Sequence, residues 1–102
     1  MIDVTVGASK LKSIYERLPP VTCFVYVIGS SGQGLARTYV GWTTNLGQRL
    51  AAHNAGTGAR STRGRDWVML YAEAYQTRGE AMSREWHLKR DKKFRKMLSA
   101  GA

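Results

Sequence analysis

The sequence of 102 residues is poor in cysteine and acidic side chains and has no long apolar run. Cys23 is the single cysteine, which excludes an intrachain disulfide and indicates a reducing compartment. One cysteine and two well-separated histidines, His53 and His87, also make a structural zinc site improbable. No apolar stretch approaches the ~18 residues of a membrane span, and the N-terminus lacks the apolar segment of a signal peptide. We therefore expect a cytoplasmic protein with one small domain and no membrane partner.

Basic residues are abundant by contrast. There are 16 Lys and Arg against 7 Asp and Glu, which gives a net charge of +9 and a pI near 10.2. This balance favours a polyanionic partner, with nucleic acid first, although a solvated basic surface is the simpler alternative. The clustering of arginines within residues 60–65 favours nucleic acid. The residues expected to contact it are Arg60, Thr62, Arg63, Arg65, Lys89, Lys92 and Lys93.

Hydrophobic periodicity predicts an α+β domain built around a three-stranded β-sheet flanked by helices. An amphipathic helix over 9–18 makes residues 1–20 an N-terminal helical extension of the main domain, 21–102. This helix can pack on its own domain or on a second copy of it. The strand over 67–75 is so apolar that we expect it in the middle of the sheet, buried on both faces. The other predicted elements are strands over 21–28 and 37–42, helices over 46–53 and 79–90, and a bend or new short helix near 91–93.

Two ionisable residues lie on the apolar face of the predicted helix over 46–53. Arg49 and His53 share that face with Leu46 and Leu50. Arg49 can bind a phosphate through its planar guanidinium, or it can bury its stem and keep its charged end in water. His53 can accept or relay a proton, or it can interact with the dipole at the helix end.

Glu85 is the most informative single residue. It falls among Ala81, Met82 and Leu88, where a helix is expected to be apolar. An ion pair with Lys89 is the alternative, but such a pair contributes only ~0.2–0.5 kcal/mol and does not explain the position in the stripe. A carboxylate facing a basic cleft suits Mg²⁺, and the lack of a clear second carboxylate favours one metal ion over two.

Two tyrosines stand at the centres of the strands of the predicted hairpin. If the register brings Tyr26 near Tyr39, both phenols lie on one face, where they can transfer a proton or position a water. Ordinary cross-strand aromatic packing is the alternative. Gly41, at the end of the second strand, permits close approach of another group to the backbone, or an unusual turn.

Together these residues resemble the GIY-YIG endonuclease superfamily over roughly 22–90. Residues 25–27 (Val-Tyr-Val) stand in place of the GIY motif, and residues 39–41 (Tyr-Val-Gly) stand in place of YIG. Residues 43–54 resemble the family's first-helix motif, and Glu85 lies where the family has its metal-binding glutamate. The stretch from Gly58 through Thr62-Arg63-Gly64-Arg65 to Glu73 is similar to small stand-alone bacterial members.

The sequence departs from the family pattern at two positions. Val25 replaces the first motif's glycine, which varies across the family. Trp42 stands where DNA-repair relatives of the excision-nuclease type carry a lysine, so the detailed mechanism of that subgroup does not transfer.

The resemblance implies a ββαβα core and a metal-dependent endonuclease that hydrolyses phosphodiester bonds by a one-metal mechanism. DNA is the expected substrate more than RNA, in repair or recombination. Glu85 would hold one Mg²⁺ or Mn²⁺, and Arg49 would stabilise charge on the phosphoryl oxygens. Tyr26 or Tyr39 would orient or deprotonate the attacking water, with His53 as proton acceptor or relay.

Two other functions stay open at this point. One is a non-catalytic nucleic-acid-binding module that retains the fold. The other is an assembly domain that forms a homodimer through the N-terminal helix.

Overall fold

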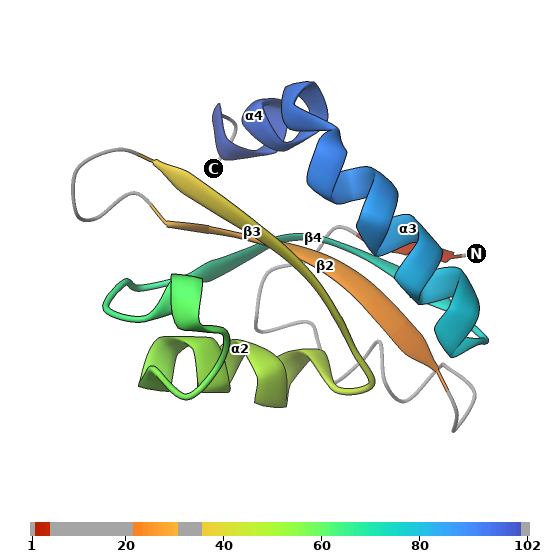
Figure 1. The fold of residues 1–102 in the computed structure, drawn as a ribbon, viewed down its shortest axis with the longest axis horizontal. Coiled ribbons are helices and arrows are strands. Elements are labelled where there is room, and N and C mark those ends of the chain that lie inside the picture. The colour runs from red at the N-terminus through yellow and green to blue at the C-terminus, as the bar shows by residue number, and fades with distance from the viewer. Residues whose placement is uncertain (1, 5–21, 31–35, 101–102) are drawn as a thin grey trace.

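The chain forms a four-stranded antiparallel sheet with helices on both faces (Figure 1). A computed structural model describes residues 2–4, 22–30 and 36–100. The predicted α+β class is confirmed, and the predicted strands and helices of the main domain are all found. The strands are β1 (Ile2–Val4), β2 (Cys23–Ser30), β3 (Arg37–Thr43) and β4 (Val68–Tyr75), and the helices are α2 (Leu46–Ala55), α3 (Arg78–Arg90) and α4 (Lys92–Ala100), with a 3₁₀ turn, η2 (Arg60–Thr62).

The strand order is β1-β4-β2-β3, so the predicted three strands form the main sheet and β1 pairs with the outer edge of β4. Sequence analysis missed β1 because three residues are too few to show an alternating pattern. Every residue of β2 is buried, whereas β4 is only partly so. The strand over 67–75 is therefore an interior strand of the sheet, as expected, with β1 on one side and β2 on the other, but the strand that is completely buried is β2.

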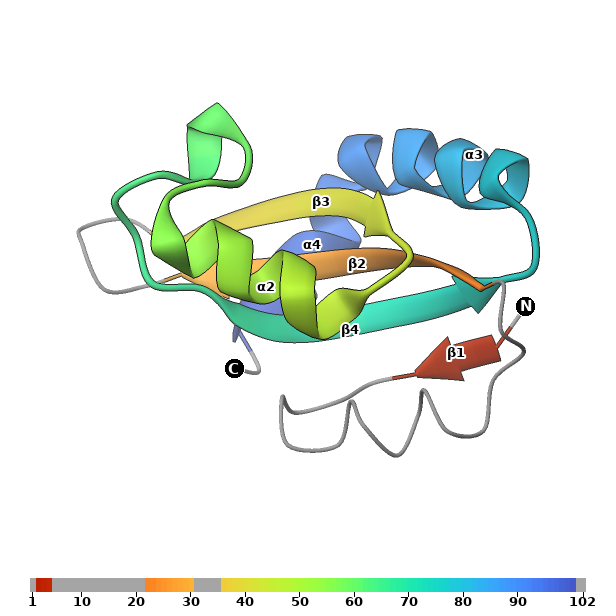
Figure 2. The ribbon, with the colours of Figure 1, turned by 90° about the horizontal axis from the view of Figure 1, so that it is seen from below.

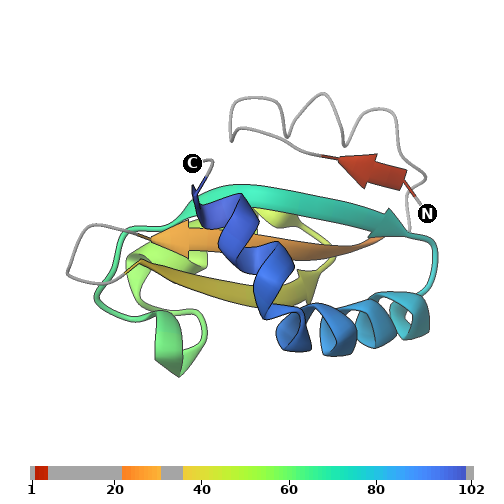
Figure 3. The ribbon, with the colours of Figure 1, turned by 90° about the horizontal axis from the view of Figure 1, so that it is seen from above.

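The two faces of the sheet carry separate apolar layers (Figures 2 and 3). α2 covers one face, while α3 and α4 cover the other. Alternation along β2 supplies both layers, because neighbouring side chains point to opposite faces. Phe24, Tyr26 and Ile28 face α2, and Cys23, Val25 and Val27 face α3 and α4.

Local sequence fixes where the helices begin and end. Asn45 is the N-cap of α2, and its side chain accepts a hydrogen bond from the Gln48 amide at 3.0 Å. Gly56 ends the helix in the left-handed conformation with φ of 79°. Asp91 interrupts the helical run after α3 and accepts a bond from the Phe94 amide at 3.1 Å, which starts α4. The predicted bend near 91–93 is therefore a break between two helices.

The predicted helix over 9–18 and the dimer contact suggested for it lie outside the described residues. Among the residues that the structure does describe, no helix has the length and apolarity to cross a membrane.

Candidate active site

The sheet register places the two motif tyrosines on one face. Tyr26 of β2 is paired with Gly41 of β3, and Ile28 is paired with Tyr39. The tyrosines are thus offset by one pair along the same face, and their ring centroids are 6.4 Å apart. Both pack with the α2 layer.

Gly41 leaves the space that the Tyr26 side chain occupies. A Cβ atom built on Gly41 would lie 2.4 Å from the Tyr26 hydroxyl oxygen and 2.6 Å from the ring carbon that bears it. Both atoms belong to a side chain that is fully buried and cannot move aside without disturbing the core. The glycine is therefore required so that the phenol can cross β3 with its hydroxyl over the bare Cα.

His53 of α2 receives the end of that phenol. The Tyr26 hydroxyl lies 2.7 Å from His53 Nε2, and His53 Nδ1 lies 2.8 Å from Thr62 Oγ1. Thr62 Oγ1 also donates to the Ala59 carbonyl oxygen at 2.8 Å, which uses its only hydrogen. Thr62 must then accept from Nδ1–H, which leaves Nε2 without a proton to accept from Tyr26. The hydrogen bonds thus select one neutral tautomer of the imidazole.

The loop after α2 is folded onto the histidine ring. A Cβ at Gly58 would lie 2.6 Å from His53 Nδ1, so glycine lets the backbone approach the ring closely. Thr62 is fully buried, and its carbonyl accepts a bond from Trp67 Nε1 at 2.8 Å. Asn54 holds the Trp67 backbone with two further bonds, of 2.6 Å and 3.0 Å. Thr62 is therefore a support for His53, and the expectation that it contacts nucleic acid is wrong.

Arg49 joins the two phenols. Its side chain lies close to both hydroxyls, and its interaction with Tyr26, with a smaller contribution from Tyr39, raises the pKa of Arg49 further above that of ordinary arginine. Burial raises the pKa of Tyr26 to about 12, although the hydrogen bond and charge of Arg49 oppose that rise. Burial, with a smaller contribution from the Arg49 charge, lowers the pKa of His53 below 6.5. The histidine is consequently neutral at neutral pH, as the hydrogen bonds require.

Glu85 approaches this cluster from α3. Its charge acts on Tyr26 and adds to the rise in the pKa of that phenol, after the larger effect of burial. Its side chain is 23% exposed and lies 3.9 Å from Lys89 Nζ, so the ion pair expected as the alternative is present but long and exposed. Met82 is 45% exposed and does not belong to the buried stripe, which Ala81 and Leu88 form.

The carboxylate of Glu85 is the metal ligand that this cluster offers, and it fits a single hard cation. Within 2–4, 22–30 and 36–100 there is no group of three or more His, Cys, Asp or Glu side chains that could hold a metal ion. A partly exposed carboxylate such as Glu85 suits Mg²⁺ or Mn²⁺, because such an ion takes most of its ligands from water and phosphate oxygens.

The predicted nucleic-acid-binding residues fall into two groups. Arg60 and Arg63 are exposed and flank Thr62, so they lie next to the catalytic candidates. Arg65 is half-buried and donates to Ser30 Oγ at 3.2 Å, which ties the loop to the end of β2.

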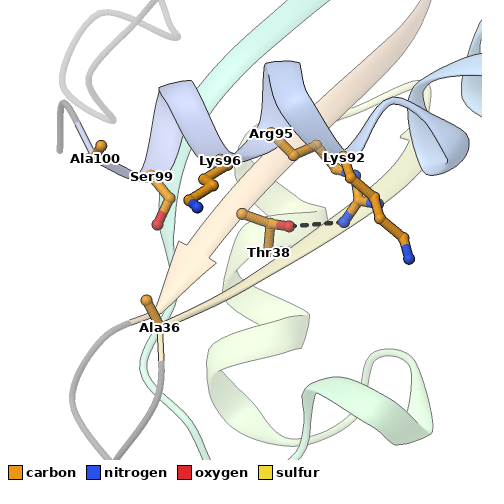
Figure 4. Close-up of a pocket in the computed structure, with 7 residues that line it drawn as sticks. All are labelled: Ala36, Thr38, Lys92, Arg95, Lys96, Ser99 and Ala100. Atoms are coloured by element: carbon orange, nitrogen blue, oxygen red, sulfur yellow. Dashed lines mark hydrogen bonds between the residues drawn. The ribbon is translucent and has the colours of Figure 1, made fainter.

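The second group, Lys89, Lys92 and Lys93, is exposed on α3 and α4. Lys92 lines an open pocket of about 630 Å³ between β3 and α4 (Figure 4). Helix α4 lies on the face of the sheet opposite α2 (Figure 1). Arg95 crosses this pocket to donate to Thr38 Oγ1 at 3.0 Å. No catalytic candidate lines it.

The family model described as the GIY-YIG catalytic domain matches residues 22–97. The chain belongs to the GIY-YIG family. No solved structure matches it. Relatives of this GIY-YIG domain carry the name UPF0213 protein, which states no activity.

Three such relatives come from bacteria and an archaeon. The Clostridium perfringens protein is 44% identical over 68 residues, which cover 66% of this chain and 70% of the relative. The Staphylococcus haemolyticus protein is 42% identical over 65% of this chain and 78% of its own. The Halobacterium salinarum protein is 46% identical over 64% of this chain and 82% of its own.

Sequence analysis missed several residues that shape this GIY-YIG domain. Glu73 is buried in β4 with Arg84 as its partner, and the only signal was a carboxylate within an apolar strand. Trp86 is 53% exposed with the Arg90 guanidinium carbon 3.7 Å from its ring centroid. The i,i+4 spacing of that pair was the available signal.

Replacing Gly41 with alanine should displace the Tyr26 phenol, because the new Cβ would lie 2.4 Å from its hydroxyl. We expect the GIY-YIG domain to lose about 1–3 kcal/mol of stability, as for other overpacked cores. The hydroxyl should also lose its bond to His53. Urea unfolding and the NMR signals of the His53 ring measure the two effects. Unchanged ring signals in the alanine variant would contradict the close approach.

The buried neutral histidine should make stability depend on pH. Because the pKa of His53 is lowered in the folded state, the unfolded chain takes up the proton first as pH falls. Stability should be complete above about pH 6.5 and decline below it. Thermal melting of His53→Gln should lack this decline between pH 6.5 and 5, whereas the exposed-residue control His87→Gln should keep it. Equal pH profiles for all three proteins would rule out a buried neutral His53.

Proposed function

We propose that this domain is a divalent-metal-dependent endonuclease that hydrolyses phosphodiester bonds in nucleic acid, with DNA as the expected substrate. The supporting observation is the convergence of Tyr26, Tyr39, Arg49 and His53 on one sheet face within reach of the Glu85 charge. Phosphodiester hydrolysis needs a proton acceptor for water and positive charge for the phosphoryl oxygens. This cluster contains both.

The proton acceptor is the Tyr26–His53 pair. Neutral His53 accepts the Tyr26 proton through the 2.7 Å bond, and Tyr26 takes the proton of the attacking water in the same step. Arg49, whose charge acts on that phenol, stabilises the negative charge that builds up on its oxygen during the transfer. Tyr39 is more exposed than Tyr26 and orients the water.

Glu85 would hold the Mg²⁺ or Mn²⁺ ion. When bound, the ion supplies Lewis-acid stabilisation of the scissile phosphate and the leaving oxygen. Arg49 adds a fixed positive charge on the same face, which binds and orients the phosphate.

Nucleic acid would be held by the exposed basic residues around this cluster. Arg60 and Arg63 lie beside His53 through Thr62. On α3, Lys89 and Trp86 lie on the Glu85 side of the buried stripe, since each residue turns the helix by about 100°. Both are exposed, and Trp86 with its stacked Arg90 offers a surface for a base.

Glu85→Gln should abolish cleavage, with a loss of about 100-fold or more, because the metal ligand is removed while the shape is kept. Binding of uncleaved DNA should change only a few-fold, since the basic residues remain. The assay uses labelled single-stranded, duplex and branched DNA and RNA with Mn²⁺, Mg²⁺ or EDTA. Glu80→Gln, an exposed carboxylate on the same helix, is the matched control and should cleave normally. Undiminished cleavage by Glu85→Gln would refute this assignment.

DNA affinity should fall steeply with salt because phosphate contacts release counterions. Removing the charges of Arg60 and Arg63 together should lower the slope of log affinity against log salt by about 2, one for each phosphate contact. Fluorescence anisotropy at several salt concentrations measures this slope. The control Lys96→Gln, in the α4 pocket, should change the slope by less than 0.5 (about half of one contact). Equal slopes in the wild type and the double variant would exclude these two contacts.

A further inference from the structure

The sheet face covered by α3 holds a buried carboxylate that the proposed reaction does not use. Glu73 of β4 is 1% exposed. Arg84 Nε donates to Glu73 Oε1 at 2.8 Å, and Arg84 Nη2 donates to Oε2 at 3.0 Å. Tyr75 donates to Oε1 at 2.5 Å, and Tyr71 donates to Oε2 at 2.6 Å. We call Glu73, Arg84, Tyr71 and Tyr75 the Glu73 cluster.

A cluster of this kind contributes orientation more than stability. Burial alone would raise the pKa of Glu73, but the bonds from Arg84, Tyr71 and Tyr75 outweigh it and lower the pKa. Buried ion pairs lose much of their attraction to desolvation and are often no more stabilising than apolar residues of similar volume. Their bonds are directional, however, which apolar contacts are not.

Helix α3 also contacts the sheet through apolar side chains and through Arg78, whose guanidinium carbon lies 5.3 Å from the centroid of the Trp42 ring. Its buried residues are Ala81 and Leu88. These contacts hold the helix against the sheet, but they are less directional than a pair of charged hydrogen bonds and tolerate a small roll about the helix axis. The two parallel bonds from Arg84 to Glu73 are directional and resist that roll.

Rotation of α3 decides where Glu85 lies. Arg84 and Glu85 are consecutive, so they project about 100° apart and lie on opposite sides of the line through Ala81 and Leu88. Arg84 is bonded to Glu73 on one side. On the other side, the charge of Glu85 acts on Tyr26. Fixing the first residue therefore fixes the second.

We propose that Glu73 is a positioning residue that sets the rotation of α3, through Arg84, so that Glu85 faces Tyr26 and Arg49. The proposal rests on the proposed function, in which Glu85 holds the metal ion. Tyr71 and Tyr75 complete the acceptor capacity of the carboxylate and hold it in one orientation.

The test separates positioning from stability with three variants. Glu73→Gln keeps the shape but loses the paired charge. The double variant Glu73→Leu, Arg84→Met replaces the pair with apolar side chains, which should restore melting temperature without directional bonds. Glu80→Gln, exposed on the same helix, is the matched control. Each protein is measured for melting temperature, for the Mn²⁺ concentration that gives half-maximal cleavage, and for Mn²⁺-induced broadening of the His53 ring NMR signals without nucleic acid.

We expect the half-maximal Mn²⁺ concentration to rise about 10- to 100-fold in both Glu73 variants, as for other residues that orient a metal ligand. The broadening of the His53 signals should need correspondingly more Mn²⁺, and Glu80→Gln should match the wild type. If Glu73→Gln does not fold, the double variant still gives both measurements.

The two proposals fail in different ways. A double variant with the wild-type melting temperature and the wild-type Mn²⁺ response would overturn the positioning role, as would an unchanged response in folded Glu73→Gln. A wild-type protein that shows Glu73-dependent broadening by Mn²⁺ but no cleavage would support positioning and overturn the nuclease function.

Discussion

The buried hydrogen bond between Tyr26 and His53 is the interaction on which the candidate active site depends. Both side chains are almost completely removed from water, so an unpaired hydroxyl or ring nitrogen there would be costly. Each group satisfies the other, and Thr62 satisfies the remaining ring nitrogen. In this arrangement His53 is neutral, and its unprotonated Nε2 accepts the hydrogen bond of the Tyr26 hydroxyl. One arrangement therefore meets the demands of packing and of proton transfer.

Two glycines make this bond sterically possible. Gly41 lets the phenol cross β3, and Gly58 lets the loop backbone close against the imidazole. Gly41 lies in the YIG-like motif of the family. It matters here because it has no side chain, which leaves room for the Tyr26 phenol. Glycine is required at such positions because a group from elsewhere in the chain packs against the backbone where a Cβ would be. At both positions, that approaching group belongs to the Tyr26–His53 pair.

Much of the fold, and the grouping of the main residues of the candidate site, were predictable from sequence because they depend on local rules. The spacing of Arg49 and His53 on one helix face, the Asn45 cap and the Gly56 stop are properties of a few neighbouring residues. Glu85 was recognisable because a charge within an apolar stripe is unusual.

The rest required contacts between distant segments. Thr62 was read as part of a basic loop, and only the folded loop shows that it is buried against His53. The partner of Glu73 is eleven residues away on another element, so neither residue alone signals the pair. Met82 is exposed because the sheet contact of α3 is narrower than its apolar periodicity indicated.

The most direct test of this account is the tautomer of His53, measured by ¹⁵N NMR of the imidazole nitrogens at pH 7. The account predicts a neutral ring with the proton on Nδ1 and an unprotonated Nε2 that accepts from Tyr26. His87, which is exposed, gives an internal reference in the same spectrum. A proton on Nε2, or a charged ring with protons on both nitrogens, would contradict the proton-accepting role of the Tyr26–His53 pair.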